Sequence, residues 1–390
     1  MKVYGLDQVG RKIPELLIKD VKNKFNPEKW TWKPHNPEKI KNIKKVIEKE
    51  RKETYYTVIT NYEYNPKKRQ KVVLSFSMGN LAYGLINHYE EKGIKFFYIN
   101  YVQFLAQQGK IVVSSDGENE QKFIAIQNTK LDLNDVAVVL WTPPNFPHPI
   151  VDFDMIPART GRNKFLFRKR WQQFLISLEI LLDHAVWIPG KPKNGSQEWQ
   201  NKIGEYFMCK KYGFNIPPFI FTNDETELRK FFKGEKKALL REFSCPPYSF
   251  PPIHLDLKTH KFDLLEVSPT TFQKYIDKEF EMRVVVFFDQ VFPCKIYSQN
   301  SDLTKEDWRV HDDENVKWEL STLPSTFKKN LVQFVKDLGL AWASIDLIKS
   351  PDGKYYFLEA NRPGAHYWLD MFIGLDITDV ISSKIKKLVK

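Results

Sequence analysis

Three oxygen-bearing side chains, Asp346, Glu359 and Asn361, lie on two neighbouring apolar segments near the end of the chain. Residues two apart on a strand point to the same face of a sheet, so Glu359 and Asn361 project together. Between the two segments, Pro-Asp-Gly at 351–353 is a turn sequence that predicts a β-hairpin. Carboxylate and amide oxygens are hard ligands, so their convergence would suit Mg²⁺ that holds nucleotide phosphates.

The length of this turn decides whether Asp346 joins the set. If Asp352 and Gly353 form a two-residue loop, Asp346 lies directly opposite Glu359. A three-residue loop shifts the register by one residue and turns Asp346 away. An ordinary amphipathic hairpin whose polar residues face water is a competing interpretation of the same pattern.

Two candidate cationic residues, Arg283 and Lys202, precede the acidic residues in the chain. Arg283 stands among a methionine and three valines in a predicted strand, and a buried cation needs a partner because an unpaired buried charge is costly. Glu281, which shares its face at two-residue spacing, and a phosphate group are both candidate partners. Lys202 lies in the first turns of a predicted helix, where a lysine by itself is most simply a surface charge.

Two further segments could contact a ligand. The strand predicted at 271–276 can offer backbone N–H and C=O groups to an adenine edge, or it can be an ordinary edge strand. Arg309 follows Asp307 and Trp308 in a polar loop, where it could clamp a carboxylate or form a surface cation–π pair. No order of Ser, His and Asp or of Cys and His supports a catalytic triad.

The elements that must position these residues follow from apolar patterns. Residues 1–70 are rich in Lys, Asn, Pro and Glu, and they predict a polar helix at 37–54 and a strand at 55–62. A helix at 80–92 between strands predicts a small parallel sheet, without a G-x-G-x-x-G dinucleotide fingerprint. The strands expected in this sheet are 71–76, 94–100 and 136–141.

The second half of the chain predicts two more lobes, joined to the first by a long helix at 160–184. Ser196 is a candidate N-cap and Gly213 a candidate C-cap of one helix, and Asn223 and Asp224 cap another. The further helices expected are 197–212, 225–232 and 324–338, and the further strands 219–222, 238–242, 271–276, 282–288 and 291–297.

Composition limits the classes of function. The chain has 390 residues, 42% of them hydrophobic, and a formal net charge of +12, which attracts polyanions without choosing among nucleotides, acidic peptides and nucleic acids. Three distant cysteines indicate neither a zinc site nor a disulfide framework and favour a reducing, cytoplasmic setting. With no apolar run of about 18 residues, a membrane partner is not expected.

The order of Lys202, Arg283, Asp346, Glu359 and Asn361, with a hinge strand between the first two, resembles the ATP-grasp fold. More closely, the chain is similar to the graspetide synthetases, ATP-dependent macrocyclases of the microviridin type that cross-link ribosomal peptides. The resemblance is strong from about residue 195 to the C-terminus, faint over 71–155 and absent over 1–70. The matching segments are 201–202, 213–217, 269–276, 281–284, 298–299, 307–309 and 346–361.

The resemblance implies an α/β fold class with several lobes. It divides the chain into a basic N-terminal extension, a pre-ATP-grasp α/β domain, a connecting helix, a central ATP-grasp lobe with a lid, and a C-terminal antiparallel-sheet lobe with the Mg²⁺ site. The corresponding ranges are 1–70, 71–155, 156–190, 191–267 and 268–390.

The same resemblance implies roles for the candidate residues. Lys202 and Arg241 would contact ATP phosphates, Arg283 would stabilise the transferred phosphoryl group, and Arg309 would grip a substrate carboxylate. The adenine hinge and nearby nucleotide contacts would come from Gln273, Lys274, Tyr275, Ile276 and Lys278. The metal ligands would be Asp346, Glu359 and Asn361.

The implied activity is ATP-dependent ligation of a carboxylate to an amine or hydroxyl through an acyl-phosphate, with ATP and Mg²⁺ as cofactors. The partner would be an acidic precursor peptide bearing hydroxyl or lysine side chains, and a homodimer is left open. Some features differ from the family pattern: Arg241 replaces a lysine, prolines replace lid glycines, Val310 replaces an arginine, and residues 142–144 lack an arginine pair. Ligation of small amino acids and a catalytically silent scaffold therefore remain alternatives, and nucleic-acid binding has only the basic charge in its favour.

Overall fold

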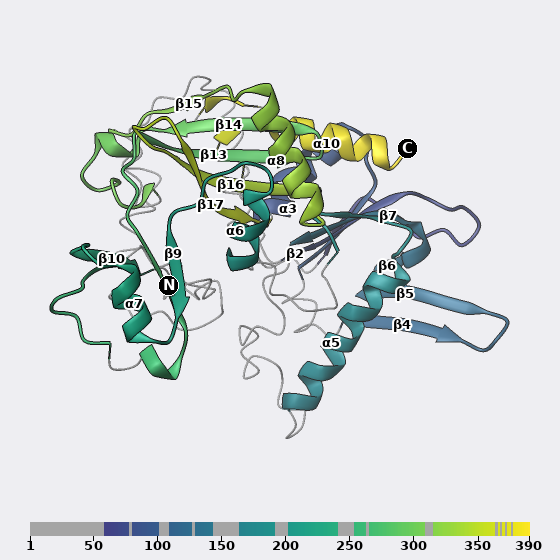
Figure 1. Cartoon of the computed structure of the whole chain (residues 1–390). Coiled ribbons are helices and arrows are strands. Elements are labelled where there is room, and N and C mark those ends of the chain that lie inside the picture. Colours follow the sequence, from purple (N-terminus) through teal and green to yellow (C-terminus); the bar gives the residue numbers. More distant parts are fainter. Residues whose placement is uncertain are drawn as a thin grey trace, which may run out of the picture.

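The computed structural model describes residues 58–77, 80–100, 109–126, 129–142, 164–191, 202–240, 253–262, 265–308, 315–362, 366, 369–370, 373–375 and 377–390. These residues form four β-sheets with helices packed against them (Figure 1). Among them, no helix is both long and apolar enough to cross a lipid bilayer. The helix expected at 37–54 and the Ser196 cap lie outside the described residues.

The first sheet is largely parallel, as the sequence predicts. Its strand order is β1 (Val58–Thr60), β3 (Phe96–Asn100), β2 (Val72–Ser77), β7 (Val136–Thr142) and β8 (Val186–Ile188). β2 runs parallel to β3 and β7, and β7 parallel to β8, whereas β1 is antiparallel to β3. Every residue of β2 from Val72 to Phe76 is buried, which is typical of a parallel strand covered on both faces.

Helices cover both faces of this sheet. α3 (Asn80–Glu91) lies on one face, and α5 (Lys164–Leu181) packs through Leu178 into the core on the other. A three-stranded antiparallel sheet beside α5 consists of β4 (Lys110–Ser115), β5 (Glu120–Ile126) and β6 (Thr129–Asp132). The sequence analysis predicts none of these three strands, because only single residues such as Ile124 and Leu131 enter the core and the rest are half-buried or exposed.

The central lobe is a four-stranded antiparallel sheet with one helix. Its strand order is β11 (Ile253–Asp256), β10 (Lys237–Leu240), β12 (Thr270–Gln273) and β9 (Phe219–Thr222). The helix α7 (Glu225–Phe231) begins after Asp224, whose carboxylate accepts the backbone N–H groups of Thr226 and Glu227, as predicted. The expectation of a strand over 271–276 is partly wrong, because β12 ends at Gln273 and the chain continues without regular structure.

The last sheet is five-stranded and antiparallel, in the order β15 (Trp318–Leu320), β14 (Gln290–Ile296), β13 (Phe280–Phe287), β16 (Trp342–Lys349) and β17 (Tyr355–Asn361). The even-numbered residues of β13, such as Val284, pack against α8 (Ser325–Asp337) through Leu331 and Phe334, in a core that also includes α6 (Lys202–Lys210). The odd-numbered residues face the other way. This alternation leaves Glu281 and Arg283 on the face opposite α8.

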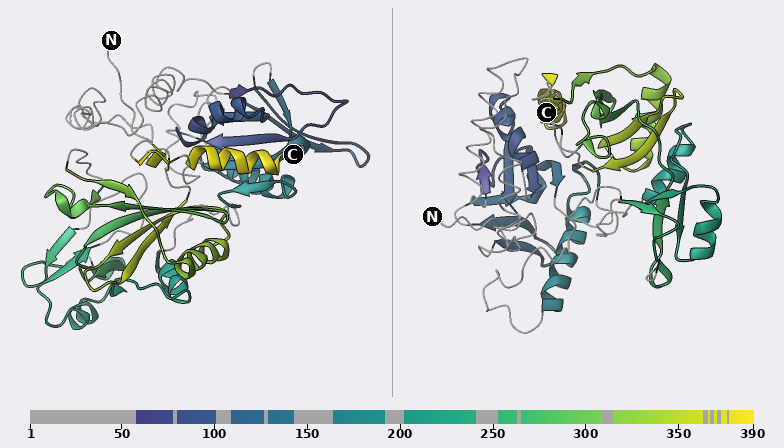
Figure 2. Two further views of the ribbon diagram at one scale, coloured as in Figure 1. Left: turned by 90° about the horizontal axis from the view of Figure 1, so that it is seen from above. Right: turned by 90° about the vertical axis from the view of Figure 1, so that its left-hand side faces the viewer.

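The C-terminal helix α10 (Ile377–Leu388) returns to the first sheet. Figure 2 shows it, in yellow, lying along the purple and blue N-terminal elements. Ile377, Ile381 and Ile385 recur at four-residue spacing and are fully buried in one core with Leu85 of α3 and Phe287 of β13. This core therefore joins the first sheet to the last one, and both ends of the described chain contribute to it.

The shared core makes a testable prediction. We expect Ile381→Ala to lower the free energy of unfolding by about 2–5 kcal/mol, because it deletes buried methyl groups and leaves a cavity. Chemical denaturation monitored by circular dichroism measures this loss. The control, Lys387→Ala, changes an exposed residue of the same helix and should have little effect. Equal stabilities of the two variants would show that α10 is not part of the core.

Candidate active site

The hairpin that carries the acidic residues has a three-residue loop and a compensating bulge. Ser350 pairs with Lys354 through the hydrogen bond from its N–H, and Gly353, at φ 86°, occupies the left-handed conformation that such a loop requires. From this closing pair the two strands keep one register as far as Leu347, which lies opposite Phe357. Between Leu347 and Asp346 the register shifts by one residue, so that Asp346 lies opposite Glu359.

The bulge decides the geometry of the site. The extra residue in the bulged strand, Leu358, opposes no residue of β16 and lines the same pocket as Glu359. Asp346 therefore lies opposite Glu359, the pairing expected for a two-residue loop. The loop has three residues, and the expectation that such a loop turns Asp346 away is wrong, because the bulge restores the register.

Four charged side chains form a buried cluster at this position. Asp346 accepts from Arg283 Nη1, 2.8 Å from both carboxylate oxygens, and Glu359 Oε2 lies 2.7 Å from Lys202 Nζ. The side chains of Lys202, Arg283, Asp346 and Glu359 are 8, 9, 12 and 13% exposed. The predicted ion pair of Arg283 is with Asp346 on the neighbouring strand, and not with Glu281.

Asn361 connects the two carboxylates. Its Nδ2 donates to Asp346 Oδ2 at 2.9 Å and to Glu359 Oε1 at 3.1 Å. Burial, together with the neighbouring Glu359 carboxylate, raises the pKa of Asp346 to about 6, although Arg283 opposes the rise.

The three residues fit a hard divalent cation through the chemistry of their oxygens. Turning the Asn361 amide by half a turn would present Oδ1 where Nδ2 now lies. In the described part of the chain, no group of three or more His, Cys, Asp or Glu residues could hold a metal, so this set depends on the Asn361 amide as its third member.

Lys202 reaches the cluster because α6 is tied to β17. The helix ends at a glycine in the left-handed conformation, Gly213 with φ 77°, which confirms the predicted C-cap. The chain then runs beside β17, where Asn215 accepts the N–H of Phe357 at 2.8 Å and donates from its side chain to the Tyr355 carbonyl at 3.1 Å. These contacts fix the distance between the helix and the strand that carries Glu359.

A pocket that is partly open to solvent connects the acidic cluster with the expected hinge. Asp346 and Glu359 line it together with all four hinge residues, from Gln273 to Ile276, and with Lys278. The Gln273 side chain donates to the Tyr206 hydroxyl at 2.6 Å and is buried, and its backbone pairs with β9 and β10, so Gln273 contributes to the pocket wall rather than to a ligand.

The hinge backbone is partly committed to the protein. The Lys274 N–H donates to the Pro218 carbonyl at 2.9 Å, and its ammonium pairs with Glu235 at 3.0 Å. The backbones of Tyr275 and Ile276 make no hydrogen bond to any other described residue. They are the groups of the hinge that remain for an adenine edge.

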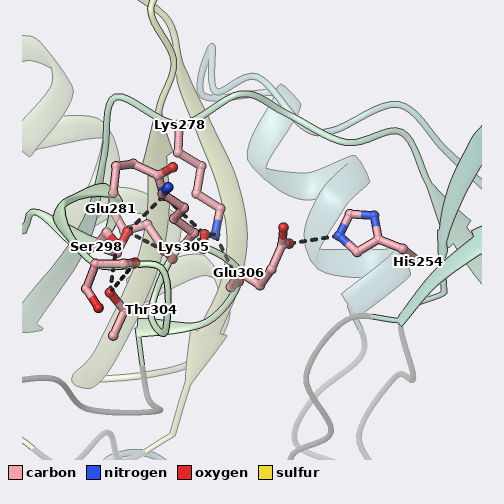
Figure 3. A network of polar contacts seen from close by, with 9 residues as sticks. His254, Lys278, Glu281, Ser298, Thr304, Lys305 and Glu306 are labelled. Carbon is pink, nitrogen blue, oxygen red and sulfur yellow. Dashed lines mark hydrogen bonds and ion pairs between the residues drawn. The ribbon is translucent and has the colours of Figure 1, made fainter.

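Lys278, predicted as a nucleotide contact, belongs to a separate network (Figure 3). Its Nζ lies 3.0 Å from Glu281 Oε1 and 3.0 Å from each of the carbonyl oxygens of Lys305 and Glu306. Glu306 in turn lies 2.9 Å from His254 Nε2, which comes from β11 in the central lobe. Arg241 and Arg309 lie outside the described residues, and their roles stay predictions.

Glu205 and Arg362 are functional candidates that the sequence analysis misses. Glu205 lies three residues after Lys202 on α6, is 2% exposed, pairs with Arg362 at 3.2 Å and accepts the Ala360 N–H at 3.2 Å. Burial raises its pKa to about 7, with Arg362 opposing the rise. The one sequence signal was its spacing of three from Lys202, which places both on one helix face.

The raised pKa of Glu205 predicts a pH-dependent stability. Between about pH 4.5 and 7 the folded protein keeps a proton that the unfolded chain has released, so the free energy of unfolding falls as pH rises. A shift of this size corresponds to about 3 kcal/mol at most. In Glu205→Gln this contribution is absent, and urea denaturation at several pH values should give a flatter profile. An unchanged profile, matching that of the exposed control Glu227→Gln, would contradict the burial of a protonated Glu205.

No protein-family model matches the chain, and no curated protein matches it. Among solved structures, it is similar to a RiPP-associated ATP-grasp ligase from Chryseobacterium gregarium in complex with ADP and a leader and core peptide. The TM-score is 0.68 at 22% identity, covering 82% of this chain and 96% of that one.

A macrocyclase and a second ATP-grasp ligase give similar values. MdnC from Microcystis aeruginosa MRC, bound with the precursor peptide MdnA, has a TM-score of 0.63 at 22% identity and covers 82% of this chain and 99% of its own. The ATP-grasp ligase PsnB, complexed with a minimal precursor, has a TM-score of 0.64 at 16% identity with the same coverage. The expectation of fold is thereby confirmed: this chain has the ATP-grasp fold.

Proposed function

We propose that the chain is an ATP-dependent ligase that joins a carboxylate to an amine or a hydroxyl. One observation carries the proposal. A single pocket is lined by the hinge segment, whose Tyr275 and Ile276 backbones make no hydrogen bond to another described residue, and by Asp346 and Glu359, which pair with the buried cations Arg283 and Lys202. The hinge backbone suits the edge of a nucleotide base, and the charged cluster suits a polyphosphate with its metal.

Charge balance explains why the cluster suits Mg·ATP. In the structure, Lys202 neutralises Glu359 and Arg283 neutralises Asp346, so the cluster has no net charge. Mg²⁺, held by Asp346, Glu359 and Asn361, would supply charge neutralisation to the phosphates. Lys202 and Arg283 would then be free to turn to the phosphate oxygens without leaving either carboxylate uncompensated.

The reaction follows from this arrangement. A substrate carboxylate oxygen attacks the γ-phosphorus, the bond from that phosphorus to the bridging oxygen breaks, and ADP leaves. An amine or hydroxyl then attacks the acyl carbon, phosphate leaves with the bonding electron pair, and the nucleophile loses its proton. The protein would position the reacting groups and stabilise the negative charge on the phosphates through Lys202 and Arg283. The predicted roles of Arg241 and Arg309 would add to this stabilisation.

The substrate class we propose is a ribosomal precursor peptide with acidic side chains and hydroxyl or lysine partners. The support is the set of structures with this fold, which are ligases and macrocyclases in complex with precursor peptides. The bond formed can be an ester or an amide, since both follow from the same acyl-phosphate. Ligation of small amino acids is the alternative, and its support is the set of altered arginines and lid prolines in the sequence.

ADP release tests the function. We expect Mg·ATP with acidic peptides that contain Thr, Ser or Lys to release ADP well above the rate without peptide, and the peptide to lose about 18 Da per bond formed, as expected for loss of water. Free amino acids and dipeptides form the second arm. Release with that arm alone would favour the small-substrate alternative, and release with neither would favour a silent scaffold.

The acidic cluster makes a separate prediction. We expect Glu359→Gln to lower the rate of ADP release by about a hundredfold or more, because the neutral amide removes a negative charge from the metal site and leaves Lys202 without its carboxylate partner. The control Glu227→Gln changes an exposed glutamate of α7 and should keep full activity. Thermal melting establishes that both variants are folded. Full turnover by folded Glu359→Gln would refute the assignment of this residue.

A further inference from the structure

The network around Lys278 lies beside the pocket, and the reaction above does not use it. The ammonium has three N–H donors and three acceptors at 3.0 Å, which are Glu281 Oε1 and the carbonyl oxygens of Lys305 and Glu306. All its donors are therefore engaged with the protein. Lys278 can bind a phosphate only by giving up one of these contacts.

The network holds together the two ends of a loop, residues 298–308. At the start of the loop, Ser298 Oγ donates to Glu281 Oε1 at 2.9 Å, and the Thr304 hydroxyl donates to the Ser298 carbonyl at 2.7 Å. At its end, two consecutive carbonyls accept from Lys278. Both ends of the loop thus converge on one ion pair (Figure 3).

The ion pair is buried, and each member depends on the other. The side chains of Lys278 and Glu281 are both 7% exposed. Burial raises the pKa of Glu281, and the neighbouring Lys278 opposes that rise. Removing the ammonium would leave a buried carboxylate without its counter-charge and the Glu306 carbonyl without this donor, while the Lys305 carbonyl keeps Gln299 Nε2 at 3.1 Å; this disfavours the observed loop conformation.

The loop leads directly to a wall of the pocket. Glu306, Asp307 and Trp308 line the same pocket as the hinge residues, Asp346 and Glu359. The Trp308 ring packs edge-on against Trp318 of β15, with centroids 5.3 Å apart, and Glu306 reaches His254 in the central lobe. Lys278 and Glu281, which line the same pocket, therefore help to set the position of this wall through the contacts of Lys278 with the Lys305 and Glu306 carbonyls.

We propose that Lys278 and Glu281 are positioning residues that hold the loop 298–308 as a fixed wall of the pocket, so that the acceptor peptide meets a preformed surface beside the phosphate site. This proposal rests on the proposed function for its substrate. It assigns Lys278 to the placement of the loop and not to the nucleotide.

Hydrogen exchange of the full chain tests the loop without any substrate. The amides of Thr304 and Lys305 donate to the Ser301 carbonyl within the loop, and that of Asn300 donates to the Tyr297 carbonyl just before it; all three report the closure of the loop. We expect Lys278→Met to accelerate their exchange about tenfold or more, with the amides of β13 and β16 unchanged. The matched control is Lys305→Met, because that lysine pairs with Asp302 and is 47% exposed. Equal exchange in the two variants would overturn the proposal.

Binding and kinetics separate a loop role from a nucleotide role. Titration of Mg·ADP should give the same affinity for Lys278→Met as for the wild type. In Lys278→Met, the KM for the peptide that gives the fastest ADP release should rise about tenfold, while the KM for ATP stays the same as in the wild type. Glu281→Gln, which keeps an acceptor for Lys278 and Ser298, should restore part of the loop protection relative to Glu281→Leu. A loss of Mg·ADP affinity without faster loop exchange would make Lys278 a nucleotide contact and refute the proposal.

The two proposals can fail separately. If the wild type neither binds Mg·ADP nor releases ADP, the proposed function fails, while the exchange data still decide whether Lys278 closes the loop. If the wild type turns over and Lys278→Met has unchanged loop exchange and an unchanged peptide KM, the positioning proposal alone fails.

Discussion

Charge compensation within a buried cluster is the constraint on which the rest of this structure depends. Two cations, Lys202 and Arg283, and two carboxylates, Asp346 and Glu359, share a site in which each side chain is at most 13% exposed. None of the four can remain charged there alone, because an isolated buried charge is costly. The elements that carry them must therefore hold their relative positions, and a ligand that enters must replace the charges it displaces.

Three structural features hold the cluster together. Arg283 and Asp346 are direct neighbours in the register of β13 and β16, so the sheet itself fixes that pair. A bulge at Leu358 turns Glu359 toward the same pocket, and the segment after α6 binds β17 through Asn215, which sets the reach of Lys202. Behind the cluster, Glu205 and Arg362 form a second buried pair between the same helix and strand. The site is thus built mainly on strands and one helix, which position side chains more accurately than loops do.

The sequence predicts most of the elements that enter the core, because buried strands and amphipathic helices have strong local patterns. The strand of Phe219–Thr222, the cap at Asp224 and the hairpin are examples. The small sheet of β4, β5 and β6 has a weaker pattern, since much of it faces water. The four-residue repeat of Ile377, Ile381 and Ile385 is a sequence signal for α10, which is not among the helices predicted above.

The candidate site follows from the sequence in part only, for a physical reason. The order of the charged residues along the chain can be read directly from the sequence, and the resemblance based on that order leads to the correct fold. Their contacts are not local: the partner of Arg283 is 63 positions away, and the bulge at Leu358 has no distinctive residue to announce it. Likewise, the N–H donors of the Lys278 ammonium are occupied partly by backbone carbonyls of a loop that is distant in the sequence, and a pattern of side chains does not predict such contacts.

The central claim is that the two carboxylates and Asn361 hold a metal that the nucleotide needs. Calorimetric titration of the wild type with the non-hydrolysable analogue AMPPNP, in Mg²⁺ and in EDTA, tests it most directly. The account predicts binding in Mg²⁺ and an affinity that is lower by about a hundredfold or more in EDTA, because without the metal Lys202 and Arg283 can turn to the polyphosphate only by leaving the two carboxylates uncompensated. Equal affinity under both conditions, or no heat with Mg²⁺ at millimolar nucleotide, would contradict it.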